Sequence, residues 1–162
     1  MSFTFQKPKN TKSIAEVMAK TLHTKAIPLN LITKKGRGTE EEREKEKKFF
    51  SRALAAGKKA DFIVIGTPTS FQKAHSKITR FTRDVEAKNI ALFCTYYNKV
   101  GTTLTDLETM LKNRNINVVG SLEIGNLKSG QFKELDKPTQ NKYIKRAKEF
   151  IKRCKSNFKM RQ

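Results

Sequence analysis

A loop near the start of the chain, residues 6–11, has the residue types of a phosphate-binding turn. It joins a short strand expected over residues 2–5 to an amphipathic helix expected from Thr11 onward. The free backbone N–H groups and the positive end of that helix would point into the loop, as they do where helices bind phosphate. Asn10 and Thr11 would add side-chain donors. Four further residues complete the candidate phosphate site: Gln6, Lys7, Lys9 and Lys12. An ordinary turn with Asn10 or Thr11 as helix cap would use the same residues, so both interpretations stay open.

A second loop, "GTPTSF" at residues 66–71, follows a buried apolar run and carries several hydroxyl groups. Its polar residues and its turn-forming proline are Thr67, Pro68, Thr69 and Ser70. Phe71 would stand at the loop tip, outside the core, where a large aromatic side chain needs a ligand, a partner protein or a neighbouring helix to cover it.

A third loop, "CTYYNKVG" at residues 94–101, has the same character. Two tyrosines, Tyr96 and Tyr97, leave the end of a buried strand, and strand alternation would turn one of them inward. The polar residues beside them are Thr95 and Asn98. Two aromatic rings on neighbouring loops, with polar groups between them, can hold a flat heterocycle.

The elements that would position these loops alternate between strand and helix. Continuous apolar runs at residues 61–66 and 89–96 are typical of strands buried on both faces of a sheet. The remaining expected strands are 2–5, 26–32 and 116–125, and the expected helices are 11–22, 39–57, 78–85, 101–115 and 137–162. This order predicts an α/β three-layer sandwich, with a five-stranded parallel sheet and helices on both faces. Ligands bind such sheets beyond the carboxyl ends of the strands, where the three loops lie.

Local signals add detail to this prediction. Pro28 favours an edge position for the second strand. Thr39 and Glu42 have the spacing of a capping box at the start of the second helix, and Gly57 is expected to end that helix. The chain has 162 residues and no obvious internal boundary, so one domain over residues 1–162 is expected.

The charge is unusual, since 35 Lys and Arg residues stand against 15 Asp and Glu residues and give a formal net charge of +20. Such a field attracts nucleic acid, anionic lipid or an acidic protein partner. The C-terminal segment 137–162 is a large contributor, with ten basic residues and a single acidic one, Glu149. For any one of these lysines taken singly, a solvated helix face is the preferred explanation.

Other chemistry finds little support in the sequence. The two cysteines, Cys94 and Cys154, fall in apolar segments and are expected to be buried thiols of a cytoplasmic protein. No stretch has the length of a membrane span or the pattern of a signal peptide, and the two histidines form no metal-ligand spacing. The chain lacks the P-loop motif and the aspartates of a phosphoreceiver domain, and no histidine stands near a nucleophile with an orienting acid.

The chain resembles flavodoxins and flavodoxin-like FMN proteins over nearly its whole length. The segments that carry the resemblance are "NTKSIAEVMAKTL", "ADFIVIGTPTSF", "KNIALFCTYYNKVGTTLTDLETML" and "INVVGSLEIG". The resemblance implies that the first loop takes the place of the family's phosphate loop, in which Asn10 and Thr11 match the family pattern. Lys9 stands where the family has glycine, and Pro8 stands where it has a hydroxyl residue. The second and third loops would contact the flavin ring, with Phe71 and one of Tyr96 or Tyr97 stacked on its faces.

The resemblance implies an FMN-binding electron-transfer protein, and the positive charge of the chain indicates an acidic redox partner. The altered phosphate loop keeps an alternative open, because lysine at positive φ carries a steric cost and proline lacks an N–H donor. In this alternative the chain is a cofactor-free binding module for nucleic acid or an acidic partner. A flavin-dependent reductase acting on a quinone is a third option, although no nicotinamide site is evident in the sequence.

Overall fold

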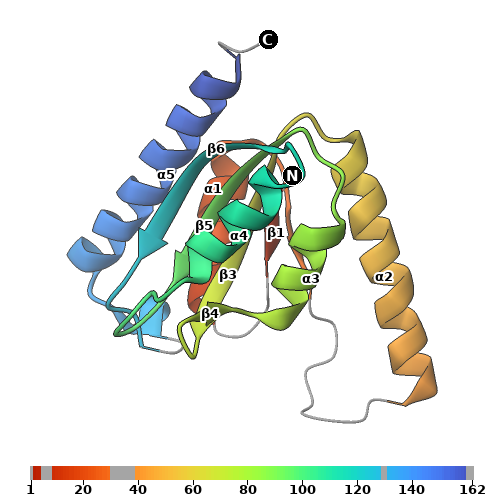
Figure 1. The fold of residues 1–162 in the computed structure, drawn as a ribbon. Coiled ribbons are helices and arrows are strands. Elements are labelled where there is room, and N and C mark those ends of the chain that lie inside the picture. Colours follow the sequence, from red (N-terminus) through yellow and green to blue (C-terminus); the bar gives the residue numbers. More distant parts are fainter. Residues whose placement is uncertain (1, 5–8, 30–38, 129–130, 160–162) are drawn as a thin grey trace.

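The computed structural model of the chain describes residues 2–4, 9–29, 39–128 and 131–159. Strands and helices alternate along it (Figure 1). The strands are β1 (Ser2–Thr4), β2 (Ala26–Pro28), β3 (Ile63–Ser70), β4 (Lys73–Ala74), β5 (Asn89–Thr95) and β6 (Asn117–Ile124). The helices are α1 (Lys9–Thr21), α2 (Glu40–Lys59), α3 (Ser76–Asp84), α4 (Thr103–Lys112) and α5 (Lys137–Lys159), with a short 3-10 helix η1 (Gln131–Glu134) before the last.

The sheet has the order β2-β1-β3-β5-β6, and each neighbouring pair in this path is parallel. The register of the central pair runs from Ile63 opposite Ile90 to Pro68 opposite Thr95. The short strand β4 pairs antiparallel with the end of β3, so the sheet is mixed and the expectation of a purely parallel sheet of five strands was wrong in this respect. Pro28 lies in the edge strand β2, as expected from its missing N–H donor.

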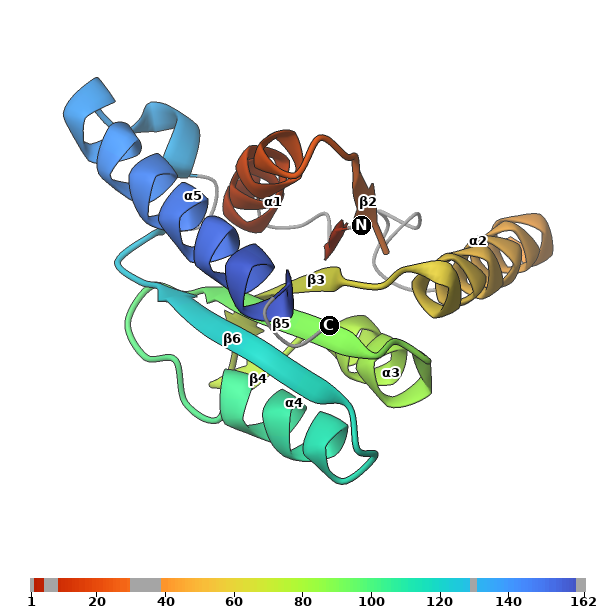
Figure 2. The same cartoon turned by 90° about the horizontal axis from the view of Figure 1, so that it is seen from above.

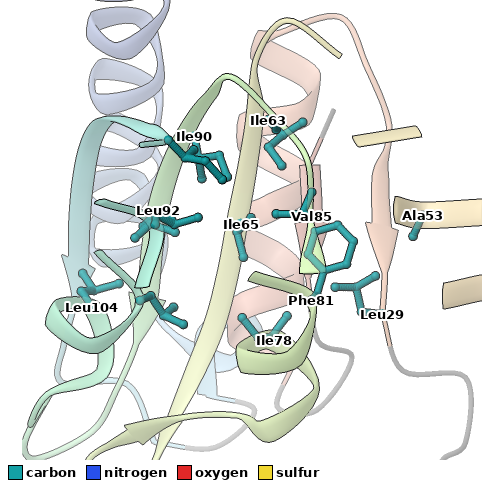
Figure 3. Packing of buried hydrophobic residues seen from close by; sticks show 14 of the residues in the cluster. Leu29, Ala53, Ile63, Ile65, Ile78, Phe81, Val85, Ile90, Leu92 and Leu104 are labelled. Carbon is teal, nitrogen blue, oxygen red and sulfur yellow. The ribbon is translucent and has the colours of Figure 1, made fainter. Parts of the chain in front are cut away.

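Helices cover both faces of the sheet, with α1 and α5 on one face and α3 and α4 on the other (Figure 2). Alternation along β3 divides its side chains between two apolar cores. Ile63 and Ile65 pack in the core beneath α3 and α4, which Figure 3 shows from close by. Val64 packs with the apolar stripes of α1 and α5 on the other face. The strand is buried on both sides, which explains its continuous apolar sequence.

The ends of α2 illustrate one correct and one wrong prediction. Thr39 and Glu42 form the expected capping box, because the Thr39 hydroxyl accepts from the Glu42 N–H and the Glu42 carboxylate accepts from the Thr39 N–H. Gly57 does not end the helix, which continues to Lys59 and is followed by Ala60 as its cap. Gly57 is buried, and a Cβ there would lie 2.8 Å from a methyl group of Val85. The glycine therefore allows close packing and does not serve as a turn.

Two further observations bear on function. Among the described residues, no helix is long and apolar enough to cross a membrane. The described residues also contain no cluster of three or more His, Cys, Asp or Glu side chains with which a metal ion could be bound.

Candidate functional site

The candidate site lies at the carboxyl ends of β3 and β5, beside the start of α1. Figure 1 shows the hairpin that follows β3 and the loop that follows β5 at the same end of the sheet. The register brings these loops together, because Pro68 near the end of β3 is paired with Thr95 at the end of β5. Of the residues expected in the phosphate loop, Gln6 and Lys7 lie outside the described residues, as does the side chain of Lys9.

Asn10 joins the start of α1 to the segment that follows β6. Its side chain is 1% exposed, and its amide group donates to the carbonyl oxygens of Leu127 (3.4 Å) and Lys128 (2.6 Å). Its side-chain oxygen accepts a hydrogen bond from the N–H of Phe132 at 2.9 Å. Both polar ends of this side chain are used within the protein, so Asn10 ties the start of α1 to the segment that follows β6.

Thr11 joins the same helix start to the third loop. Its hydroxyl is 2.6 Å from the hydroxyl of Thr95, and both side chains are buried. A hydrogen bond this short between two buried groups fixes the distance between α1 and the end of β5. Lys12, one residue further along, is exposed, and its Nζ atom lies 3.9 Å from Oε1 of Glu16.

Thr67 connects the end of β3 to the start of α3. Its buried hydroxyl accepts from the N–H of His75 (3.0 Å) and donates to the carbonyl of Pro68 (2.9 Å). His75 is half-buried and caps α3, because its Nδ1 accepts from the N–H of Lys77 at 3.3 Å. Burial is the main reason why the pKa of His75 lies below its ordinary value, and the charge of Lys77 adds to the effect. This histidine therefore serves as a helix cap.

The second loop is a tight hairpin. The strand β3 continues through Thr69 and Ser70 and then returns as β4, so that only Phe71 and Gln72 form the turn. Both turn residues have positive φ, 49° and 61°, which defines a type I′ turn. Asn and Gly usually occupy such positions, because a side chain with a Cβ is strained there. The prediction of a loop over residues 66–71 was therefore wrong for residues 66–70, which belong to β3.

The hairpin rests against the start of α4, which holds the strained turn in place. The N–H of Thr102 donates to the carbonyl of Gln72 at 3.0 Å, and the Thr69 hydroxyl donates to that of Thr103 at 2.9 Å. Gly101 has a φ of 57°, and a Cβ there would lie 2.2 Å from the Cβ of Gln72. Supported in this way, the turn presents Phe71 to solvent with 99% of its surface exposed.

The two tyrosines of the third loop have different environments, as alternation predicts. The ring of Tyr96 is half-buried against Gly125, where a Cβ would lie 2.5 Å from the ring. Tyr97 is 47% exposed, and the Nζ atom of Lys128 lies 5.5 Å from the centre of its ring. This is a cation–π distance. Tyr97 is therefore the tyrosine that faces outward from this loop.

Positive charge dominates the described surface of these loops. Four exposed lysines lie on these loops or directly beside them: Lys12, Lys73, Lys99 and Lys128. Ser70 and Asn98 are exposed as well and provide polar groups near the aromatic rings. Cys94, just before the third loop, is buried, and burial is the main reason why its pKa rises to about 12. This thiol therefore stays protonated and takes no part as a nucleophile.

The segment after β6, residues 125–128, belongs to the same end of the sheet and was missed in the sequence. The N–H groups of Asn126 and Leu127 donate to the carbonyls of Tyr97 and Tyr96 at 3.3 and 3.1 Å. This segment also supplies Lys128 beside the ring of Tyr97. The rule that places ligands at the carboxyl ends of parallel strands applies to the last strand too, and "EIGNLK" carries the Gly and Asn of such a loop.

No protein-family model matches the sequence, and a comparison with curated proteins finds no match. Similar folds are found among solved structures. A flavodiiron core from Synechocystis sp. is 14% identical with a TM-score of 0.66, and the match covers 99% of this chain and 36% of that protein. This chain thus spans about a third of the length of the flavodiiron protein.

Two other solved structures match over almost their whole length. A flavodoxin from the domain Archaea is 16% identical with a TM-score of 0.61, and the match covers 96% of each chain. An FMN-dependent NADH-azoreductase from Bacillus anthracis, in complex with FMN, is 12% identical with a TM-score of 0.62, and the match covers 94% of this chain and 97% of the azoreductase. At these identities the likeness concerns the fold, and the chain has a flavodoxin-like α/β fold.

Proposed function

We propose that the chain binds FMN non-covalently at this end of the sheet and passes electrons to an acidic protein partner. The observation that carries the proposal is the exposure of two aromatic rings, Phe71 and Tyr97, on loops that follow adjacent strands. They are the large exposed hydrophobic side chains of the described residues. We further propose that residues 1–162 work as one domain in the cytoplasm, which the two free and buried cysteines support.

The ring pocket is supported by the arrangement around these side chains. Phe71 stands on a strained turn that the start of α4 holds in place, and strain of this kind is common at ligand-binding sites. Tyr97 is oriented by Lys128 and by the segment after β6. The two rings would cover the faces of the flavin, and the backbone and hydroxyl groups of Thr69 and Ser70 would meet its polar edge. FMN bound there would supply one- and two-electron chemistry, and the protein would hold it and tune it.

The headgroup would be held mainly by main-chain amides and by charge. The side chains of Asn10 and Thr11 have partners within the protein, so they orient the start of α1 and do not reach a phosphate themselves. The first N–H groups of α1 have no partner within the helix and are suited to a dianion. Lys12 lies in the same turn, and the expected loop lysines Lys7 and Lys9 would add charge. This fit makes phosphate binding depend strongly on salt concentration.

The positive loops also indicate the kind of redox partner. The exposed lysines Lys73, Lys99 and Lys128 lie on the loops that carry or adjoin the two rings, where a partner must approach for electron transfer. An acidic surface on the partner would be attracted to them, and association should weaken steeply as salt is added.

The test is a titration of the purified protein with FMN and with riboflavin, which has the same ring and no phosphate. We expect the protein to bind both, with FMN bound more tightly and with its advantage shrinking as salt is added. Lys12→Gln should weaken FMN binding about fivefold (~1 kcal/mol) and leave riboflavin binding unchanged. Lys20→Gln, an equal charge change in the last turn of the same helix, serves as the matched control and should affect neither ligand.

A protein that is colourless as purified, and that binds neither ligand, would overturn the proposal. That outcome would favour the second candidate, a cofactor-free binding module with a flavodoxin-like fold. The observation on its side is the engagement of Asn10 and Thr11 within the protein, together with lysine where the family has a phosphate-loop glycine.

A further inference from the structure

The solvent face of α5 carries charge of almost one sign. Among its residues 137–158, eight basic side chains are exposed and one acidic side chain, Glu149, accompanies them. The basic residues are Lys137, Lys142, Lys145, Arg146, Lys148, Lys152, Arg153 and Lys155. The opposite face is apolar and buried, with Ala147, Phe150 and Ile151 packed in the core that α5 shares with α1. Figure 2 shows the two helices on the same face of the sheet.

A charged helix face need not look like this, as α2 in the same chain demonstrates. Its 20 residues carry seven basic and five acidic side chains. Two of its lysines pair with glutamates one turn earlier, Lys45 with Glu41 at 2.6 Å and Lys48 with Glu44 at 3.8 Å. Mixed charge of this kind keeps a helix soluble and slightly stabilises it. The one-sided charge of α5 therefore calls for an explanation beyond solubility.

Five of the cations form a row along one side of α5. Lys145, Lys148, Lys152 and Lys155 follow one another at spacings of three and four residues, and Lys137 lies on the same side further back. Neighbouring like charges at these spacings destabilise a helix by a few tenths of a kcal/mol per pair. Within the described part of α5, Lys145 forms an exposed ion pair with Glu149, with 3.9 Å between Nζ and Oε1. We call Lys137, Lys145, Lys148, Lys152 and Lys155 the α5 row.

We propose that the α5 row binds the phosphate backbone of nucleic acid. The row spans about 27 Å at the rise of an α-helix, and at the spacing of phosphates along one strand this length corresponds to about eight phosphates. A flexible single strand can follow the row and place a phosphate against each cation, whereas a winding duplex strand faces the row over only part of its length. Because lysines on such a row would contact phosphates and not base edges, binding should not depend on base sequence.

A groove between α1 and the start of α5 extends the positive surface. Four lysines line it, namely Lys20, Lys25, Lys133 and Lys137, and the acidic side chain in its lining is Glu16. Its volume is about 870 Å³. Since Lys137 belongs to both the groove and the α5 row, a strand that follows the row can continue into the groove.

The composition of the surface argues against the two other anionic partners. Protein interfaces need apolar anchors at their centre, and helices that lie on membranes insert apolar side chains. The large exposed hydrophobic side chains of the described residues are Phe71 and Tyr97, and neither belongs to α5. The apolar face of α5 is itself buried in the core. Phosphate polymer fits a surface that offers charge without apolar anchors.

Two triple variants with the same net charge test the proposal. The first is Lys148→Gln, Lys152→Gln and Lys155→Gln on α5. The matched control on α2 changes three exposed cations that form no ion pair among the described residues: Lys47→Gln, Arg52→Gln and Lys59→Gln. Binding to fluorescent single-stranded and duplex oligonucleotides of unrelated sequence is measured by anisotropy at several salt concentrations. Circular dichroism verifies that both variants are folded.

We expect the α5 variant to bind single strands about 100-fold more weakly than the wild type at about 0.1 M salt, with the slope of log K against log salt reduced by about two. The α2 variant should lose little affinity. Equal losses of affinity in both variants would mean that net charge alone determines binding, and this would overturn the proposal. So would full affinity in the α5 variant, or binding of phosphatidylserine vesicles or polyglutamate as tightly as oligonucleotides. The result does not depend on FMN binding, which the titrations with FMN and riboflavin address separately.

Discussion

The hairpin between β3 and β4 should gain stability and lose ligand affinity when its turn is given the residues that the geometry prefers. Phe71 and Gln72 both have positive φ, and a non-glycine residue in this region costs about 1–2 kcal/mol. The double variant Phe71→Asn, Gln72→Gly would form a favoured type I′ turn. We expect it to raise the free energy of unfolding by about 2 kcal/mol, which is about 4–8 °C in Tm for a chain of this size.

The same double variant should bind FMN more weakly. Phe71 is 99% exposed, so removing its ring takes almost no packing from the folded protein, and any loss of affinity must come from the ligand. An aromatic ring that stacks on a planar heterocycle contributes about 1–3 kcal/mol by truncation. This corresponds to a Kd about 5- to 150-fold higher than that of the wild type.

Urea unfolding and a fluorescence titration with FMN measure the two effects separately. Gln72→Gly alone is the matched control, because it relieves strain at one turn residue and keeps the ring. It should stabilise the fold by about 1 kcal/mol and leave FMN affinity intact. The reasoning would be refuted if the double variant were no more stable than the wild type, or if it bound FMN as tightly.

Two further predictions concern the helix α3. Because burial lowers the pKa of His75 from its ordinary value of 6.5, the unfolded chain takes up this proton first as the pH falls. Stability that is fully present above about pH 6.5 should then decrease as the pH falls toward the lower pKa of the folded state. His75→Asn keeps a helix cap without this titration. Thermal unfolding from pH 8 to 5 should therefore show a smaller loss of stability for the variant than for the wild type. An equal loss would mean that the titration of His75 does not cause the effect. The second prediction concerns Thr82, whose buried hydroxyl has no hydrogen-bond partner in the described structure. Thr82→Val should therefore raise the free energy of unfolding by about 1 kcal/mol in urea, and a decrease would mean that the hydroxyl has a partner.

The strands at the centre of the sheet could be predicted because burial on both faces leaves a plain signal. The apolar runs at 61–66 and 89–96 lie in β3 and β5, and Pro28 indicated an edge strand correctly. The hairpin could not be predicted in the same way. "TPTSFQKA" contains a proline and lacks the Asn-Gly pair of a favoured type I′ turn, so the tertiary support from Gly101 and Thr102 decides its shape. Gly57 misled for a related reason, since close packing against Val85 and a helix end both favour glycine.

The candidate site was predicted as a set of loops, and the roles of its side chains depend on contacts that are distant in sequence. Strand alternation alone predicted that one of Tyr96 and Tyr97 faces outward. Which of the two does so depends on Gly125, because the ring of Tyr96 packs against this glycine. Nothing near Asn10 in the sequence indicates that its amide binds carbonyl groups more than a hundred positions away. Local propensity does not contain such information.

The bonds of Asn10 also set when this end of the protein can assemble. Its partners Leu127 and Lys128 lie 117 and 118 positions further along the chain. A ribosome that adds about 5–20 residues per second needs about 6–23 s to cover that distance. During translation, the beginning of the first helix must therefore wait for the last strand to emerge, and a nascent chain truncated before residue 127 would leave this amide unpaired. Synthesis through Phe132 thus precedes any ligand capture that depends on this helix start.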